Sequence, residues 1–196
     1  MENTPLLTTK RLILRRFTTQ DIEAVFHLYH DPEVNTFLPM FPLQTLAEAE
    51  RLVHQTYFKD YQATNNHHYA ICLKSDNVPI GAVHVSGGES HDVGYALRKE
   101  FWHMGIVTEA CRAVIEMLRF SGMPFVTATH DINNPRSGEV MKKSGMTYRY
   151  SYEEQWQPKN RLVTFRLYQL NFTVPPDYVY RTYWDTASVH WIEKNL

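Results

Sequence analysis

The stretch from Phe101 to Glu109 reads Phe-Trp-His-Met-Gly-Ile-Val-Thr-Glu, and the hydrophobic period of the chain changes within it. Before this stretch, short segments alternate between apolar and polar residues, as strands do. After Gly105, apolar residues recur every three or four positions from Ala110 to Leu118, which is typical of one helical face. A glycine lets the backbone turn sharply between the two periods. The stretch therefore predicts a strand, a glycine loop and an amphipathic helix in that order.

A second motif, further along the chain, predicts a short helix over residues 135–143. Asn134 stands directly before Pro135, which is typical of a helix N-cap followed by proline in the first turn. Ser137 follows in that first turn, and Gly145 ends the segment as a C-terminal stop.

Patterns on either side of these motifs predict an α+β fold with a mostly antiparallel sheet flanked by helices. A capping-box pattern at Thr45 and Glu48 opens one of the helices. Strands are expected over 10–17, 68–73, 79–86, 93–97, 125–129, 148–156 and 162–172, and further helices over 18–29 and 45–61.

Composition narrows the class of protein. A chain of 196 residues with 43% hydrophobic residues can bury one substantial core. The formal net charge of −1 gives no electrostatic reason to expect a nucleic acid partner. Cys72 and Cys111 are isolated, the ten histidines lack a metal-ligand spacing, and no apolar run reaches membrane-spanning length. We therefore expect a cytoplasmic protein with no metal and no membrane partner.

The two motifs together resemble the acetyl-coenzyme A (acetyl-CoA) site of the GNAT superfamily of N-acetyltransferases. The branch that acetylates the N-termini of ribosomal proteins is the most similar. The family loop has Gln or Arg, two residues, Gly, one residue, then Gly or Ala, and here the matching segment is Trp102 to Val107. Gly105 keeps the central glycine, whereas His103 and Val107 replace residues that are small in many members. The resemblance implies a GNAT domain over residues 1–172.

The resemblance also implies a set of coenzyme-binding residues. Backbone N–H groups of the loop and the following helix start would hold the pyrophosphate, because a helix N-terminus attracts anions. The Asn134 side chain would reach the pantetheine arm, and Ser137 would lie near the sulfur and donate to the leaving thiolate. The expected coenzyme-binding residues are Leu97, Trp102, His103, Met104, Gly105, Ile106, Val107, Thr108, Asn134 and Ser137.

The activity that the resemblance implies is transfer of an acetyl group to a primary amine by direct attack, without a covalent enzyme intermediate. Such a reaction needs a base for the amine proton. Asp92 is the first candidate, and Glu154, with its neighbour Glu153, is the second; His84 and Glu89 lie in the same region of the sequence as Asp92.

The acceptor of the acetyl group stays open between a small-molecule amine and a protein N-terminus. The alternative function is a non-catalytic acyl-CoA binding or sensing module. A nucleotide-binding oxidoreductase is rejected because no Gly-x-Gly-x-x-Gly follows a strand.

The tail, residues 173–196, extends past the part that resembles the family. Pro175 and Pro176 interrupt the last strand, and Asp177 is a plausible helix cap. Aromatic residues from Tyr180 to Trp191 then recur at helical spacing. We expect an amphipathic helix that packs on its own domain, or on a second subunit in a homodimer.

Overall fold

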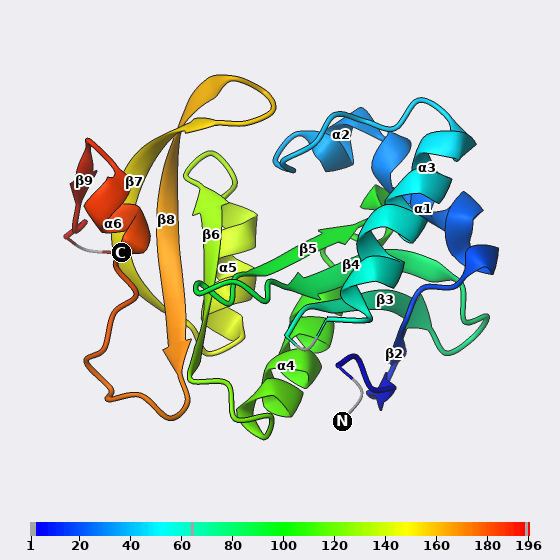
Figure 1. Ribbon diagram of the computed structural model, residues 1–196, viewed down its shortest axis with the longest axis horizontal. Coiled ribbons are helices and arrows are strands. Elements are labelled where there is room, and N and C mark those ends of the chain that lie inside the picture. Colours follow the sequence, from blue (N-terminus) through cyan, green and yellow to red (C-terminus); the bar gives the residue numbers. More distant parts are fainter. Residues whose placement is uncertain (1–2, 64, 195) are drawn as a thin grey trace.

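The structure, a computed structural model, describes residues 3–63, 65–194 and 196 (Figure 1). The strands are β1 (Leu7–Thr8), β2 (Leu12–Arg15), β3 (His67–Leu73), β4 (Pro79–Val85), β5 (Val93–Leu97), β6 (Phe125–Asp131), β7 (Thr147–Trp156), β8 (Arg161–Asn171) and β9 (His190–Trp191). The α-helices are α1 (Ile22–His30), α2 (Pro32–Asn35), α3 (Leu46–Leu52), α4 (Ile106–Arg119), α5 (Pro135–Lys143) and α6 (Thr182–Thr186). Shorter helical turns are η1 (Thr19–Asp21), the π-helical η2 (Val53–Phe58) and η3 (Lys99–Phe101). The α+β class and the order of elements predicted up to β8 are confirmed.

The sheet is divided into two antiparallel parts that meet at one point. The first part has the order β1-β2-β3-β4-β5, and the second has the order β6-β8-β7-β9. β5 and β6 run parallel, and an isolated bridge between Asp92 and Thr127 joins them at the start of β5. Figure 1 shows the two parts side by side, with β5 and β6 at their junction. The sequence predicted one mostly antiparallel sheet and did not show this division.

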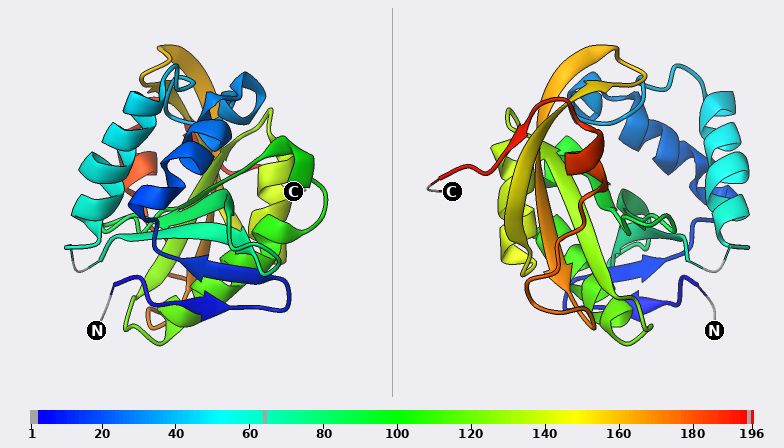
Figure 2. Two further views of the ribbon diagram at one scale, coloured as in Figure 1. Left: turned by 90° about the vertical axis from the view of Figure 1, so that its right-hand side faces the viewer. Right: turned by 60° about the vertical axis from the view of Figure 1, so that its left-hand side comes forward.

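Helices cover both faces of the first sheet. Alternate residues of β3 face opposite sides: Tyr69 and Ile71 pack in the core with α4, whereas Ala70 and Cys72 pack in the core with α1 and α3. Figure 2 shows α1 and α3 together on one side and α4 on the other. Small side chains on the α1 and α3 side leave room for those helices to approach the sheet closely. Among the described residues, no helix combines the length and the apolar character needed to cross a bilayer.

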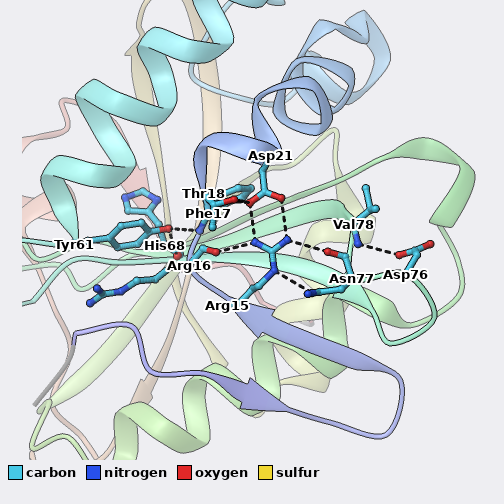
Figure 3. Close-up of polar contacts among 10 residues, drawn as sticks. All are labelled: Arg15, Arg16, Phe17, Thr18, Asp21, Tyr61, His68, Asp76, Asn77 and Val78. Carbon is cyan, nitrogen blue, oxygen red and sulfur yellow. Dashed lines mark hydrogen bonds and ion pairs between the residues drawn. The ribbon is translucent and has the colours of Figure 1, made fainter.

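A buried ion pair links β2 to the start of α1 (Figure 3). The Arg15 guanidinium contacts the two Asp21 carboxylate oxygens at 2.7 and 2.9 Å, and the Thr18 N–H donates to Asp21 at 2.7 Å. Burial by itself raises the pKa of Asp21, but hydrogen bonds from Arg15 and Thr18 outweigh it, so the pKa is lowered. Arg15 also bonds Asn77 in the β3–β4 turn, which ties the helix start to the sheet.

The tail is not the single amphipathic helix that the sequence predicted. Only five residues form α6, Asp177 caps no helix, and Trp191 lies in β9, where it pairs with Ser151 of β7. The edge of β7 supplies backbone partners for the tail, and this strand pairing replaces the helical hydrogen bonds that a long helix would make. The tail packs on its own chain, where the rings of Tyr180, Tyr183 and Trp184 contact the cluster around Tyr152 and Phe165.

A partly buried ion pair fastens the end of the tail to β8. The Glu193 carboxylate accepts two hydrogen bonds from Arg166, at 2.6 and 2.8 Å, and a third from the Ser151 hydroxyl. The Glu193 side chain is 20% exposed, and the Arg166 side chain is 22% exposed. The bonds from Arg166 hold the pKa of Glu193 below its usual range.

We predict that Glu193→Ala lowers the free energy of unfolding by about 1–2 kcal/mol, because it leaves a half-buried arginine without its partner. The matched control is Glu116→Ala, which removes the carboxylate of an exposed pair with Arg119 on α4. The control should change stability by less than about 0.5 kcal/mol. Urea unfolding followed by circular dichroism measures both, and equal shifts in the two variants would contradict the fastening role.

Candidate active site

A cleft of about 1130 Å³ lies where β5 and β6 diverge beyond their bridge. One wall consists of β5 and the loop before α4, and the other consists of the end of β6 and the start of α5. The α2 region, β7 and the tail line the remaining side. Residues from both sheets, which are far apart in the sequence, therefore face a common space.

The loop before α4 has a backbone shape suited to anions. His103 and Gly105 both have left-handed backbone angles, with φ of 64° and 70°. α4 starts directly after Gly105, so the N–H groups of residues 106–108 have no carbonyl partner within the helix and lie at its positive end. A Cβ atom on Gly105 would meet only the Arg11 guanidinium, at 3.8 Å, so the space above the loop is open.

Arg11 and Glu109 hold this loop against the β1–β2 hairpin. The Arg11 guanidinium donates to the Met104 carbonyl at 2.8 Å and to the Glu109 carboxylate at 2.6 Å. The Thr9 hydroxyl also donates to Glu109, at 2.6 Å. Burial would raise the pKa of Glu109, but these bonds outweigh it and the pKa is lowered, so the carboxylate stays ionised. Neither Arg11 nor Glu109 was predicted as a site residue, because they lie 98 residues apart in the sequence and meet only in the folded chain.

The start of α5 faces β5 across the cleft. Asn134 occupies the N-cap position, but its side chain makes no capping hydrogen bond and lies in the cleft wall. The Tyr95 hydroxyl is 2.8 Å from the Ser137 carbonyl and 2.9 Å from the Ser137 hydroxyl. Tyr95 was quoted in the sequence pattern but received no role. Tyr95 lies two residues from both Val93 and Leu97, which pack in the core with α4. This spacing places Tyr95 on the same face of β5, and it could have indicated the direction of the side chain.

Asp92 lies at the junction of the two sheets. Its carboxylate is 3.0 Å from the Thr127 hydroxyl, and it lines the cleft. Burial raises the pKa of Asp92 to about 6, against a smaller lowering by the hydrogen bond with Thr127. A carboxylate with such a pKa is ionised at neutral pH and still a usable proton acceptor.

Glu154 lies on β7 and faces the same cleft, whereas its neighbour Glu153 does not. Tyr152, Glu154 and Trp156 alternate along the strand and all line the cleft. Burial raises the pKa of Glu154. Glu153 donates its backbone N–H to Val189 of the tail, and its side chain is not in the cleft wall. The structure thus separates the two adjacent carboxylates that the sequence could not separate.

His84 of β4 also lines the cleft, but it is not a cation there. The His84 side chain is exposed to the cleft, and desolvation by the surrounding walls lowers the pKa of its imidazole, which is therefore neutral at neutral pH. Its ring lies over Gly94, where a Cβ atom would be 2.0 Å from the ring. Glu89, which the sequence placed in the same region, is exposed and does not line the cleft.

A family model described as Acetyltransferase (GNAT) domain matches residues 11–147. The chain belongs to the GNAT acetyltransferase family. Two curated relatives from Bacillus subtilis, the uncharacterized N-acetyltransferases YoaA and YnaD, are each 26% identical to it. The alignment with YoaA covers 76% of this chain and 89% of the relative, and that with YnaD covers 71% and 81%. The protein is accordingly an N-acetyltransferase.

Solved structures share the fold of this acetyltransferase. A GNAT acetyltransferase from Bacillus anthracis has a TM-score of 0.75 at 19% identity, covering 87% of this chain and 100% of that chain. The Salmonella typhimurium enzyme that modifies the N-terminal serine of ribosomal protein L7/L12 has a TM-score of 0.74 at 15% identity, covering 85% and 99%. The microcin C7 self-immunity acetyltransferase MccE, in complex with acetyl-CoA and AMP, has a TM-score of 0.73 at 18% identity, covering 83% and 93%.

The acetyltransferase cleft contains most of the residues that the sequence predicted for coenzyme binding. The predicted residues that line it are Leu97, Trp102, His103, Gly105, Ile106, Val107, Thr108, Asn134 and Ser137. Met104, the remaining predicted residue, is 56% exposed and does not line the cleft, and its carbonyl accepts a hydrogen bond from Arg11. Asp92 and Glu154 line the same cleft.

We predict that Gly105→Val weakens acetyl-CoA binding by at least about 10-fold, because a branched side chain would fill the open space above the loop. Gly122→Val is the matched control. Gly122 follows α4, has a similar left-handed φ of 83° and also faces open space. Both variants carry the same kind of backbone strain, so they should melt alike, and only Gly105→Val should lose affinity in calorimetry. Equal affinities in the two folded variants would contradict the loop's role.

Proposed function

We propose that this protein transfers the acetyl group of acetyl-CoA to a primary amine by direct attack in a ternary complex. The single observation that carries the proposal is the cleft between the diverging strands. It places an anion-attracting loop on one wall, the Ser137 hydroxyl on the facing wall, and the Asp92 carboxylate where the two strands meet.

The residues present fit acetyl-CoA. The open space above Gly105 and the unpaired N–H groups at the start of α4 suit a pyrophosphate. The Asn134 amide is not used as a helix cap, so it is available for the amide groups of a pantetheine arm. The edge of β5 that faces the gap beyond Asp92 offers further backbone donors and acceptors.

Asp92 is our first candidate for the base. The amine nitrogen forms a bond to the thioester carbonyl carbon, its proton passes to the carboxylate directly or through one water, and the carbon–sulfur bond breaks. The Tyr95 hydroxyl donates to the Ser137 carbonyl at 2.8 Å and lies 2.9 Å from the Ser137 hydroxyl, which turns its one proton from Tyr95 to the departing thiolate. Cys111 takes no part: it is a buried core residue, and burial raises the pKa of its thiol to about 12.

Two kinds of acceptor fit this chemistry, a small-molecule amine and a protein N-terminus. The Salmonella typhimurium neighbour modifies a protein N-terminus, and MccE was solved with AMP. Both are similar to this chain in fold only, so the acceptor must be argued from this chain's own cleft.

We predict that Asp92→Asn lowers kcat/KM by at least about 10²-fold, since the amide cannot take the amine proton. In the parent, kcat/KM should have an acidic limb with a pKa of about 6, to which burial raises Asp92, in addition to the separate rise caused by deprotonation of the substrate amine. That acidic limb should be absent in the variant. A variant with the parent's rate and the parent's pH profile would move the role of base to another group.

The same variant has a built-in folding control. The pKa of Asp92 is higher in the folded than in the unfolded chain, so ionisation of this group disfavours folding above about pH 6. Asp92→Asn should therefore melt at the same or a higher temperature than the parent at pH 7. The gain in the free energy of unfolding at pH 7 is at most about 3 kcal/mol, and it disappears toward pH 4.

We predict that Ser137→Ala lowers kcat by about 10²-fold with little change in the affinity for acetyl-CoA, because one donor to the developing thiolate is lost. Tyr95→Phe should cause a smaller loss, since it removes only the group that holds Ser137. Assays of thiol release measure kcat, and calorimetry measures the affinity for acetyl-CoA. A Ser137→Ala enzyme as fast as the parent would mean that the hydroxyl only belongs to the helix start.

A further inference from the structure

The walls of the cleft differ in charge. Among the described residues that line it, the only lysine and arginine are Lys143 and Arg136, and both belong to α5 on the coenzyme side. Asp131 and Glu139 also line the α5 side, but they pair with Arg161 and Lys142. Away from α5, the cleft wall contains the carboxylates of Glu33, Asp92 and Glu154. The acceptor side is therefore acidic, opposite to the side proposed for the phosphates.

Two of these carboxylates have no cationic partner within the part of the chain that the structure describes. Glu33 is 3.7 Å from the Lys99 ammonium. Among the described residues, the Asp92 carboxylate contacts the Thr127 hydroxyl, and the Glu154 carboxylate forms neither an ion pair nor a hydrogen bond. A carboxylate in a partly desolvated cleft is stabilised when a cation enters.

Tyr152 supplies an observation independent of charge. Its side chain is only 4% exposed, yet it lines the cleft and its hydroxyl has no hydrogen-bond partner among the described residues. Burial raises the pKa of Tyr152, and the charges of Asp92 and Glu154 raise it further, which shows that both carboxylates act on this hydroxyl. The Tyr152 hydroxyl is therefore free to form a hydrogen bond with a ligand in the cleft.

The tail completes this wall with a residue outside the part that matches the family model. Tyr183 of α6 stacks on Tyr152, with ring centroids 5.3 Å apart and an angle of 16° between the rings. Burial raises the pKa of Tyr183 to about 12, and Asp92 and Glu154 act on it in the same direction. The pairing of β9 with β7 and the bonds of Glu193 to Arg166 fix the position of α6.

A bridge joins the β7–β8 turn to the end of α2, beside the cleft-lining residue Thr36. The Lys159 ammonium contacts the carbonyls of Asn35 and Thr36, and Arg161 reaches the Thr36 carbonyl at 3.3 Å. Both cations also lie over the ring of Trp156, at 5.4 and 5.2 Å from its centroid, and Arg161 pairs with Asp131. Neither cation forms an ion pair with Glu154 within the described residues. A small acceptor suits such a bridged cleft better than a folded protein surface does.

We propose that Tyr152, Glu154 and Tyr183 form a subsite for a second positive charge on the acceptor, so that the preferred substrate is a small diamine or polyamine. This inference rests on the proposed acetyltransferase function. An ammonium group has three donors and no acceptor, so the Glu154 carboxylate and the Tyr152 hydroxyl match it. The ring of Phe165, which also lines the cleft, suits the methylene chain between the two amino groups.

The experiment measures acetyl transfer to diaminobutane and diaminopentane, to butylamine and pentylamine of the same length, and to aminobutanol, whose far end is polar but uncharged. The diamines should have kcat/KM values at least about 10-fold higher than the matched amines and the amino alcohol. A neutral tetrapeptide with a free N-terminus is included. Equal use of diamines and monoamines, or a preference for the tetrapeptide, would overturn the subsite and leave the acetyltransferase function standing.

Two variants separate binding of the second charge from base catalysis. Glu154→Gln should raise KM for diaminobutane about 10-fold with kcat within about two-fold of the parent. A fall in kcat for every amine would instead identify Glu154 as the base and overturn the proposal. Glu153→Gln is the matched control, since this adjacent carboxylate of β7 does not line the cleft.

Calorimetry distinguishes failure of the subsite from failure of the proposed function. Diaminobutane is titrated into the protein saturated with coenzyme A. Binding that weakens in Glu154→Gln, without turnover of any amine, would support the subsite and refute the acetyltransferase function. No binding and no turnover of diamines would overturn the subsite.

Discussion

The backbone contact between β5 and β6 at Asp92 and Thr127 is the constraint on which the cleft depends. Two parallel strands that paired along their whole length would close the sheet and leave no space between them. Here they pair at one point and then diverge, so the edge of each strand beyond that point faces the gap. Backbone groups at such an edge need partners, and an extended ligand arm can supply them.

The same junction places a carboxylate where its burial is unfavourable. Within the described part of the chain, the Asp92 carboxylate accepts one hydrogen bond, from the Thr127 hydroxyl, and burial raises its pKa to about 6. A residue chosen only for stability at this position would be neutral. The raised pKa that results from this burial suits a base, because a proton acceptor works best when its pKa is near the working pH.

The tail joins stability to the shape of the site. β9 covers part of the edge of β7, and edge strands without such cover are prone to pair with other chains. Because this cover also positions α6, Tyr183 reaches the cleft and stacks on Tyr152. A change in the tail is thus expected to alter both the folding of the second sheet and the acceptor side of the cleft.

The sequence by itself determined the order of strands and helices up to β8, the loop at Gly105 and the helix that starts at Asn134. These features depend on local periodicity, on glycine and proline, and on capping residues, which act over a few positions. The division of the sheet, the contact of Tyr95 with Ser137 and the separation of Glu154 from Glu153 depended on the tertiary structure, because they join residues from different elements. The tail shows the limit most plainly: its aromatic residues have a helical spacing, but pairing with the open edge of β7 competed with that local preference and prevailed.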